Sequence, residues 1–229
     1  MIITREMVSN YIKCPFLFGK KAMSNKYQQS HLPEEYLKIR RHISEIASYE
    51  MKNGCKLELS EYRIRYTNKY YTSKKDILNM DSITTKLNGI FEPFASNAFI
   101  GYTIPVEIPI EGSNIIYRNI VDYGLINDVG EITFVEIEKI EDLGFYKKIL
   151  KNWAHYYAIY SYLANEFNKK VNLIVLDPIQ YQRIDMVFLP ERFGEDFKVL
   201  VNTVKPLQNP SFVKNYNSCF NCVLMGENC

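Results

Sequence analysis

The 229-residue chain lacks several features that would each place it in a particular class of protein. No run approaches ~18 apolar residues, so no segment is predicted to span a membrane. The N-terminus, MIITREMVSN, has no long apolar stretch and does not resemble a signal peptide. The net charge is only +2, so any nucleic-acid surface has to be a local patch. Without repeats or low-complexity linkers, the length predicts one domain.

Cysteine is scarce but clustered. The five cysteines are Cys14, Cys55, Cys219, Cys222 and Cys229. An odd number without a secretion signal predicts reduced thiols in a cytoplasmic compartment, where clustered cysteines more often bind metal than form disulfides. The tail has the spacing Cys-x2-Cys-x6-Cys, and Cys14 lies far upstream before a proline. Four thiolates hold either a 4Fe–4S cluster or Zn²⁺, and spacing alone does not separate the two.

Helical spacing predominates in the first hundred residues. Residues 4–13, with Thr4 as a cap, predict a short helix, and a second predicted helix begins at Pro33. Its apolar positions have roughly helical spacing, and Gly54 marks its C-terminal end. Residues 56–75 fit a helix or a strand, and residues 76–90 are predicted to be helical.

From residue 102 the apolar period changes to two. Strands are predicted at 102–112, 114–126 and 131–140, and the turn NDVG joins the last two as a hairpin. A helix over 142–168, strands at 171–178 and 185–190 and a helix over 191–204 follow. This order predicts an α/β fold with a mixed central sheet flanked by helices.

Two carboxylates end an otherwise apolar strand in the stretch ITFVEIEK. Side chains alternate along a strand, so Phe134, Glu136 and Glu138 share one face, whereas Val135 and Ile137 share the other. If the NDVG turn is a two-residue turn, Asp122 lies within about a residue of Glu136. Three converging carboxylates repel unless a cation lies among them, and hard oxygen ligands suit Mg²⁺ or Mn²⁺. The alternative is a solvated face with Asp122 paired to a lysine.

The stretch NIVDYGLINDVGEITFVEIEK resembles the core of the PD-(D/E)xK nuclease superfamily, in which an Asp on one strand precedes an apolar strand ending in Glu-x-Lys. SNYIKCPFLFGKK and RRHISEIA resemble the Cys-Pro segment and the His-bearing helix of its RecB-like, iron–sulfur members. Those members include CRISPR-adaptation exonucleases and helicase–nuclease domains. The resemblance implies a restriction-endonuclease-like core.

Carried over by position, the resemblance makes His42, Asp122, Glu136 and the carbonyl of Ile137 metal ligands. Glu138 departs from the pattern because it occupies the position of the motif lysine, which stabilises charge on the scissile phosphate. A glutamate supplies no positive charge, although it can act as a general base or help to hold a second metal ion.

A Gln-x-x-x-Tyr helix follows the active-site strand in such nucleases. In NWAHYYAIYSYL, Tyr160 matches the tyrosine, but Tyr156 stands in place of the glutamine. Core packing is the alternative interpretation of these rings. Basic residues that could contact phosphates include Lys147, Lys148 and Lys151, with Lys20, Lys21, Arg40 and Arg41 as further candidates.

The resemblance also favours a 4Fe–4S cluster over zinc, held by Cys14, Cys219, Cys222 and Cys229, with Cys55 free. Such a cluster would join the N- and C-terminal segments. The expected organisation is a single domain over 1–229, with a mainly helical part (1–100), the nuclease core (101–204) and a cysteine-bearing tail (205–229).

Two hypotheses from different classes follow. The first is an Mg²⁺- or Mn²⁺-dependent DNA nuclease, of exonuclease type, acting on single-stranded DNA or DNA ends. The second is a catalytically degenerate nuclease fold that binds DNA or a protein partner in a recombination, replication, transcription or CRISPR-adaptation assembly. A zinc-stapled interaction protein is a third option.

Overall fold

One six-stranded sheet organises the part of the chain that can be described. The computed structural model describes residues 1–5, 7–8, 32–58, 60–61, 92–140 and 154–208. The strands are β1 (Ile2–Thr4), β2 (Ala98–Ile110), β3 (Ile115–Ile126), β4 (Ile132–Ile137), β5 (Val171–Asp177) and β6 (Gln182–Phe188). The helices are α3 (Glu34–Asn53), α6 (Glu92–Ala95), α8 (Ala154–Phe167) and α9 (Phe193–Val204), with 3₁₀ turns at Pro190–Arg192 and Lys205–Gln208.

The sheet is mixed, as the sequence predicts. Its order is β1-β3-β4-β5-β6, and β2 also pairs with β3. The pairs β1–β3 and β4–β5 are parallel, whereas β2–β3, β3–β4 and β5–β6 are antiparallel. With helices on both faces, the class predicted from the sequence, α/β with a mixed sheet, is confirmed.

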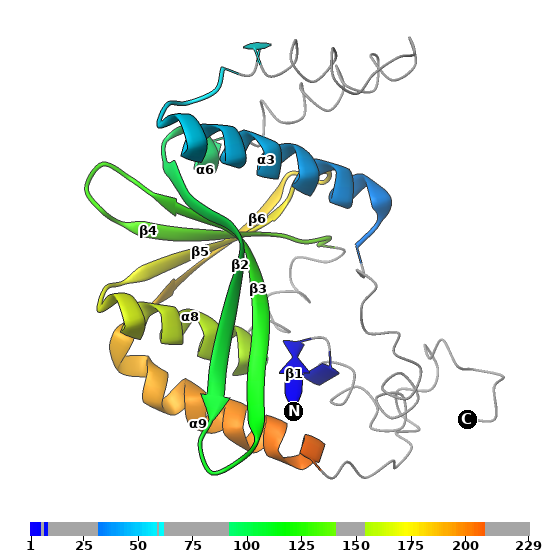
Figure 1. Ribbon diagram of the computed structural model, residues 1–229, viewed down its shortest axis with the longest axis vertical. Coiled ribbons are helices and arrows are strands. Elements are labelled where there is room, and N and C mark those ends of the chain that lie inside the picture. The colour runs from blue at the N-terminus through cyan, green and yellow to red at the C-terminus, as the bar shows by residue number, and fades with distance from the viewer. Residues whose placement is uncertain (6, 9–31, 59, 62–91, 141–153, 209–229) are drawn as a thin grey trace, which may run out of the picture.

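Each face of the sheet carries its own apolar core. One core lies under α8 and α9 and includes Phe134, Tyr160 and Phe188. The other lies under α3 and α6 and includes Ile43, Phe94 and residues of β3 and β4. Figure 1 shows α3 and α6 on one side of the sheet and α8 and α9 on the other. Burying one such side chain contributes about 1.5–3 kcal/mol, so these two layers hold the sheet between the helices.

The β3–β4 hairpin follows the predicted alternation. Ile132 and Phe134 belong to the α8–α9 core, whereas Val135 and Ile137 belong to the α3 core. Asn127 N–H donates to Glu131 O at 3.2 Å and Gly130 lies at φ 79°, so the loop holds one residue more than a two-residue turn. Glycine takes this left-handed conformation without a Cβ penalty.

The start of the chain differs from the prediction. The Thr4 hydroxyl accepts a hydrogen bond from Met7 N–H at 3.4 Å, and residues 5 and 7–8 are helical, so the predicted Thr cap is confirmed. Residues Ile2–Thr4, however, form strand β1 along β3, which the sequence pattern did not predict. Three residues are too short to show an apolar period.

The predicted helix from Pro33 is confirmed as α3. Gly54 adopts the left-handed conformation at φ 65° and donates its N–H to Glu50 O at 2.9 Å, as expected of a C-terminal glycine. No helix among the described residues is long and apolar enough to cross a membrane. The predictions for residues 9–13, most of 56–75, all of 76–90, 142–153 and the tail from 209 lie outside the described residues.

Candidate functional site

β3 changes its neighbour part-way along one edge. β2 pairs with β3 over residues Ile115 to Ile126 and so occupies one edge of β3 along its whole length. The other edge is shared, because β1 pairs with residues 116–118 and β4 pairs with residues 123–126. β1 runs parallel and β4 antiparallel to β3, so the carboxyl ends of β1 and β4 approach each other beside residues 119–122. Side chains from three strands can therefore meet at this point.

The backbone is kinked at the same place. Val121 belongs to the α8–α9 core and Tyr123 to the α3 core, although regular alternation would put both on one face. In the β2–β3 register, Thr103 falls opposite Asp122 and has φ 51°. A β-branched residue is strained in this left-handed region, and such strain is concentrated at functional sites.

Three carboxylates meet beside the kink, and we call them the acidic junction: Asp122, Glu136 and Glu138. Asp122 lies one residue beyond the Tyr123–Val135 pair and accepts a hydrogen bond from the N–H of Ile137, so it lies within about a residue of Glu136, as predicted. Glu136 is 2% and Glu138 4% exposed. Buried like charges repel at a cost of several kcal/mol unless a cation balances them. The acidic junction therefore requires positive charge.

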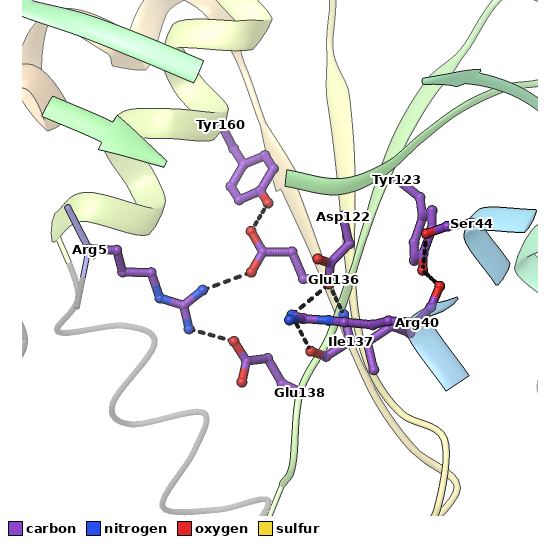
Figure 2. A network of polar contacts seen from close by, with 9 residues as sticks. All are labelled: Arg5, Arg40, Ser44, Asp122, Tyr123, Glu136, Ile137, Glu138 and Tyr160. Atoms are coloured by element: carbon purple, nitrogen blue, oxygen red, sulfur yellow. Dashed lines mark hydrogen bonds and ion pairs between the residues drawn. The ribbon is translucent and has the colours of Figure 1, made fainter. Parts of the chain in front are cut away.

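Arg40, from α3, provides one such charge. Its Nη2 lies 2.8 Å from Asp122 Oδ2 and donates to the carbonyl of Ile137 at 2.9 Å (Figure 2). The N–H of Ile137 donates to the same Asp122 oxygen at 2.8 Å. Burial raises the pKa of Asp122 to about 7; the Arg40 guanidinium opposes this shift, and the Glu136 carboxylate adds to it. Two oxygens predicted as metal ligands thus share one cationic nitrogen.

Arg5 provides the second charge. It follows β1 directly, and its guanidinium donates from Nη1 to Glu136 Oε2 at 2.8 Å and from Nη2 to Glu138 Oε1 at 2.7 Å. Its side chain is 15% exposed. Figure 2 shows the guanidinium lying between the two glutamates. Because a guanidinium is a rigid fork, it fixes the two carboxylates relative to each other.

Tyr160, predicted as a site residue, lies on α8 and donates its hydroxyl to Glu136 Oε1. Its ring packs against Phe134 and Phe188, with centroids 5.8 Å and 5.4 Å away. Burial, with the nearby Glu136 carboxylate, raises the pKa of Tyr160 well above its ordinary value, so the hydroxyl remains a donor. Tyr160 therefore both fills the core, as the alternative interpretation expected, and orients Glu136.

His42 lies buried on α3, two residues after Arg40. At about 100° per residue, Arg40 and His42 flank the buried stripe of the helix on opposite sides. Burial, with a smaller contribution from Arg41, lowers the pKa of His42 to about 4, so the ring is neutral at neutral pH, the form that binds metals. Within the described ranges, no three His, Cys, Asp or Glu side chains form a group that could hold a metal ion. The role of His42 as a metal ligand therefore stays a prediction.

Several predicted site residues lie outside the described residues. These are Lys147, Lys148 and Lys151, and the four predicted cluster ligands Cys14, Cys219, Cys222 and Cys229. Cys55 is described, exposed and carries a free thiol. The cluster therefore stays a prediction from the sequence.

Sequence reasoning missed the part played by the arginines. Arg40 was a candidate phosphate contact, but it binds Asp122 and the Ile137 carbonyl. Arg5 was not singled out, because its position depends on the unpredicted strand β1. The only available indication was the need of three carboxylates for positive charge.

Comparisons with known proteins add little to this geometry. No protein-family model and no curated protein matches the chain. One matching solved structure, described as the crystal structure of SSO0001, shares 13% identity over 89% of this chain and 98% of that chain, with a TM-score of 0.33. A TM-score this low supports no argument, so the function has to be inferred from the residues themselves.

Proposed function

We propose that the chain is a metal-dependent DNA nuclease with a restriction-endonuclease-like core and that the acidic junction is its active site. The observation that carries the proposal is the position of Arg40 Nη2, within 2.9 Å of both the Asp122 carboxylate and the Ile137 carbonyl. These oxygens converge on one cation. Mg²⁺ and Mn²⁺ prefer such hard oxygen ligands, so these two oxygens are of the kind that a divalent ion binds.

The roles of the residues follow from their contacts. Asp122, Glu136 and the carbonyl of Ile137 would hold the ion, with His42 as the further ligand that the resemblance implies. A bound divalent cation would polarise the phosphate and lower the pKa of an attacking water. Tyr160 orients Glu136. Arg40 lies on α3, and the Tyr123 hydroxyl donates to Arg40 O at 2.7 Å, which fixes this part of α3 against β3.

A 4Fe–4S cluster on Cys14, Cys219, Cys222 and Cys229 completes the proposal. It would join segments near the two ends of the sequence and thereby close a long loop, which is costly in entropy without a crosslink. An anaerobic preparation should be brown if iron is bound, and metal analysis should then find iron in place of zinc.

The second candidate is a non-catalytic binding subunit, and one observation favours it. Arg5 and Arg40 already balance the three carboxylates, so the fold can neutralise the acidic junction without an ion. In that case the site is a structural remnant, and single-stranded DNA or a protein partner binds elsewhere.

Cleavage assays separate the two candidates. Single-stranded DNA labelled at either end is incubated with Mn²⁺ or Mg²⁺ and the wild-type protein, Asp122→Ala or Asp185→Ala. Asp185 is the matched control, because it is an exposed acid paired with Arg183 on β6. We expect cleavage by the wild type and Asp185→Ala, and at least a 100-fold loss in Asp122→Ala. Absence of cleavage and of Mn²⁺ binding by the wild type would exclude the nuclease and favour the binding subunit.

A further inference from the structure

The missing motif lysine leaves the proposed active site short of one charge. In the hydrolysis of a phosphodiester, water adds to phosphorus, the P–O bond to the leaving oxygen breaks, and the products are a phosphate monoester and a hydroxyl. Negative charge accumulates on the phosphoryl oxygens during this step, and positive side chains that face those oxygens stabilise it. Glu138 stands where the lysine should be and cannot do this.

The fold brings a different cation to the same position. The Arg5 guanidinium lies 2.7 Å from Glu138 Oε1 and 2.8 Å from Glu136 Oε2. It arrives from β1, whose parallel pairing of Thr4 with Arg118 fixes where the chain leaves the sheet. A lysine at position 138 would have reached the site from β4, whereas Arg5 reaches it from the opposite direction along the same edge of β3.

We propose that Arg5 is the catalytic residue that replaces the motif lysine, and that Glu138 is a positioning residue that holds its guanidinium at the acidic junction. This inference rests on the proposed nuclease function. A guanidinium is planar and always charged, and its donors match the oxygens of a phosphate in a bidentate arrangement. Glu138 and Arg5 then belong together. The positive charge comes from Arg5, just after β1, in place of a lysine after β4, and Glu138 after β4 is its counter-charge.

The geometry explains why this pair is suited to the task. Arg5 is mostly buried, so its field acts in a low-dielectric environment where a fixed charge is worth more than in water. Glu138 N–H donates to Leu176 O at 3.0 Å, so β5 supports the backbone at Glu138 just beyond the end of β4. The positioning residue is therefore attached to the sheet.

Two double variants test the assignment. Arg5→Gln alone leaves two buried carboxylates with less positive charge and can impair folding. Arg5→Gln combined with Glu138→Gln removes one charge of each sign, whereas Arg5→Gln combined with Glu138→Lys restores the lysine of the motif. Arg183→Gln combined with Asp185→Gln is the matched control, since it removes an exposed ion pair on β6.

The measurements are kcat and KM for labelled single-stranded DNA with Mn²⁺, and the Kd for the same DNA with Ca²⁺ by fluorescence anisotropy. We expect the Gln/Gln variant to lose about 100-fold or more in kcat, with KM and Kd changed less than about fivefold. The Gln/Lys variant should recover to within about tenfold of the wild-type kcat, and the control should match the wild type. A merely structural role for Arg5 predicts no such rescue by a lysine on another strand.

The outcomes separate this inference from the function on which it rests. If the wild type cleaves DNA and the folded Gln/Gln variant keeps its kcat, Arg5 is not catalytic and the nuclease proposal stands. If the Gln/Lys variant folds but remains as inactive as Gln/Gln, the replacement of the lysine by Arg5 is wrong. If the wild type does not cleave with any divalent ion, both proposals fall.

Discussion

A single buried carboxylate, Asp177, and the three carboxylates of the acidic junction lie by the ends of the neighbouring parallel strands β5 and β4, and the two sites are stabilised in different ways. Asp177 ends β5 and is fully buried; it accepts hydrogen bonds from the hydroxyl of Tyr36 and from the backbone N–H groups of Ile140, Ile179 and Gln180. The acidic junction at the end of β4 is instead balanced by the guanidinium groups of Arg5 and Arg40.

The difference lies in which partners can be exchanged. Backbone N–H groups are fixed by the fold, so Asp177 is bound into the structure and ties β5 to α3 and to the chain beyond β4. The Arg40 guanidinium, by contrast, lies on a long side chain that another cation can displace from Asp122. Asp177, which accepts from three backbone N–H groups, is thus a structural element, whereas Asp122, which accepts from one and otherwise contacts Arg40, can serve as a ligand for an incoming ion.

The largest expected effect is that of Asp177→Asn on folding. Oδ1 of Asp177 accepts from Ile179 N–H and Gln180 N–H, both at 2.9 Å, and Oδ2 accepts from Ile140 N–H at 2.7 Å. An amide NH₂ group would face one of these donors in either orientation. We expect a loss of about 3 kcal/mol in the free energy of unfolding, measured by urea denaturation. A loss below about 0.5 kcal/mol would show that this carboxylate is not structural.

The corresponding substitution in the acidic junction, Asp122→Asn, should raise the free energy of unfolding. The folded-state pKa of Asp122, about 7, lies above its ordinary value of 3.8, so the folded protein binds more protons than the unfolded chain between these pH values. Stability contributed by this group is therefore present below pH 4 and is lost as the pH rises through 7. Asp122→Asn removes the ionisable group and therefore removes this dependence of the unfolding free energy on pH.

We accordingly expect Asp122→Asn to be about 1–2 kcal/mol more stable than the wild type at pH 8 and equal to it near pH 4, both in metal-free buffer. Urea denaturation at the two pH values measures this. Equal destabilisation at both would mean that Asp122 is structural in the same way as Asp177, and the comparison between the two groups would fail.

The sequence predicted one of these two groups far better than the other. The alternation of Phe134, Val135, Glu136 and Ile137 assigns each side chain to a face, because side-chain direction along a strand is set locally. The NDVG turn, although one residue longer than predicted, brings Asp122 close to Glu136 and Ile137. These are short-range properties, and the structure confirms them.

The partners of these carboxylates could not be predicted in the same way. Arg5 reaches the acidic junction only because Ile2–Thr4 pair with β3 more than a hundred residues later. For Asp177 the sequence predicts only a strand that ends at the Asp-Pro step. The donors Ile179 and Gln180 are local, but Tyr36 and Ile140 belong to α3 and to the chain after β4. Both depend on contacts between distant segments, which leave no local pattern. For the same reason the sequence shows only that Glu138 lacks the positive charge of the motif lysine, whereas the fold places the Arg5 guanidinium beside it.

The smallest effect, and the finest test, comes from two tyrosines that each donate a hydroxyl to a carboxylate. Tyr36 donates to Asp177 and Tyr160 donates to Glu136. Either change to Phe removes one charge-assisted hydrogen bond and leaves other donors in place, so we expect each to cost about 1 kcal/mol in unfolding free energy. Only Tyr160→Phe should also lower the rate of DNA cleavage, by about tenfold, because Glu136 then loses its fixed orientation at the proposed active site. Initial rates measured on both variants at saturating Mn²⁺ make the comparison direct. If Tyr36→Phe lowers the rate as much as Tyr160→Phe does, catalysis depends on general rigidity at the ends of β4 and β5, and the distinction between a structural and an exchangeable carboxylate has no functional meaning.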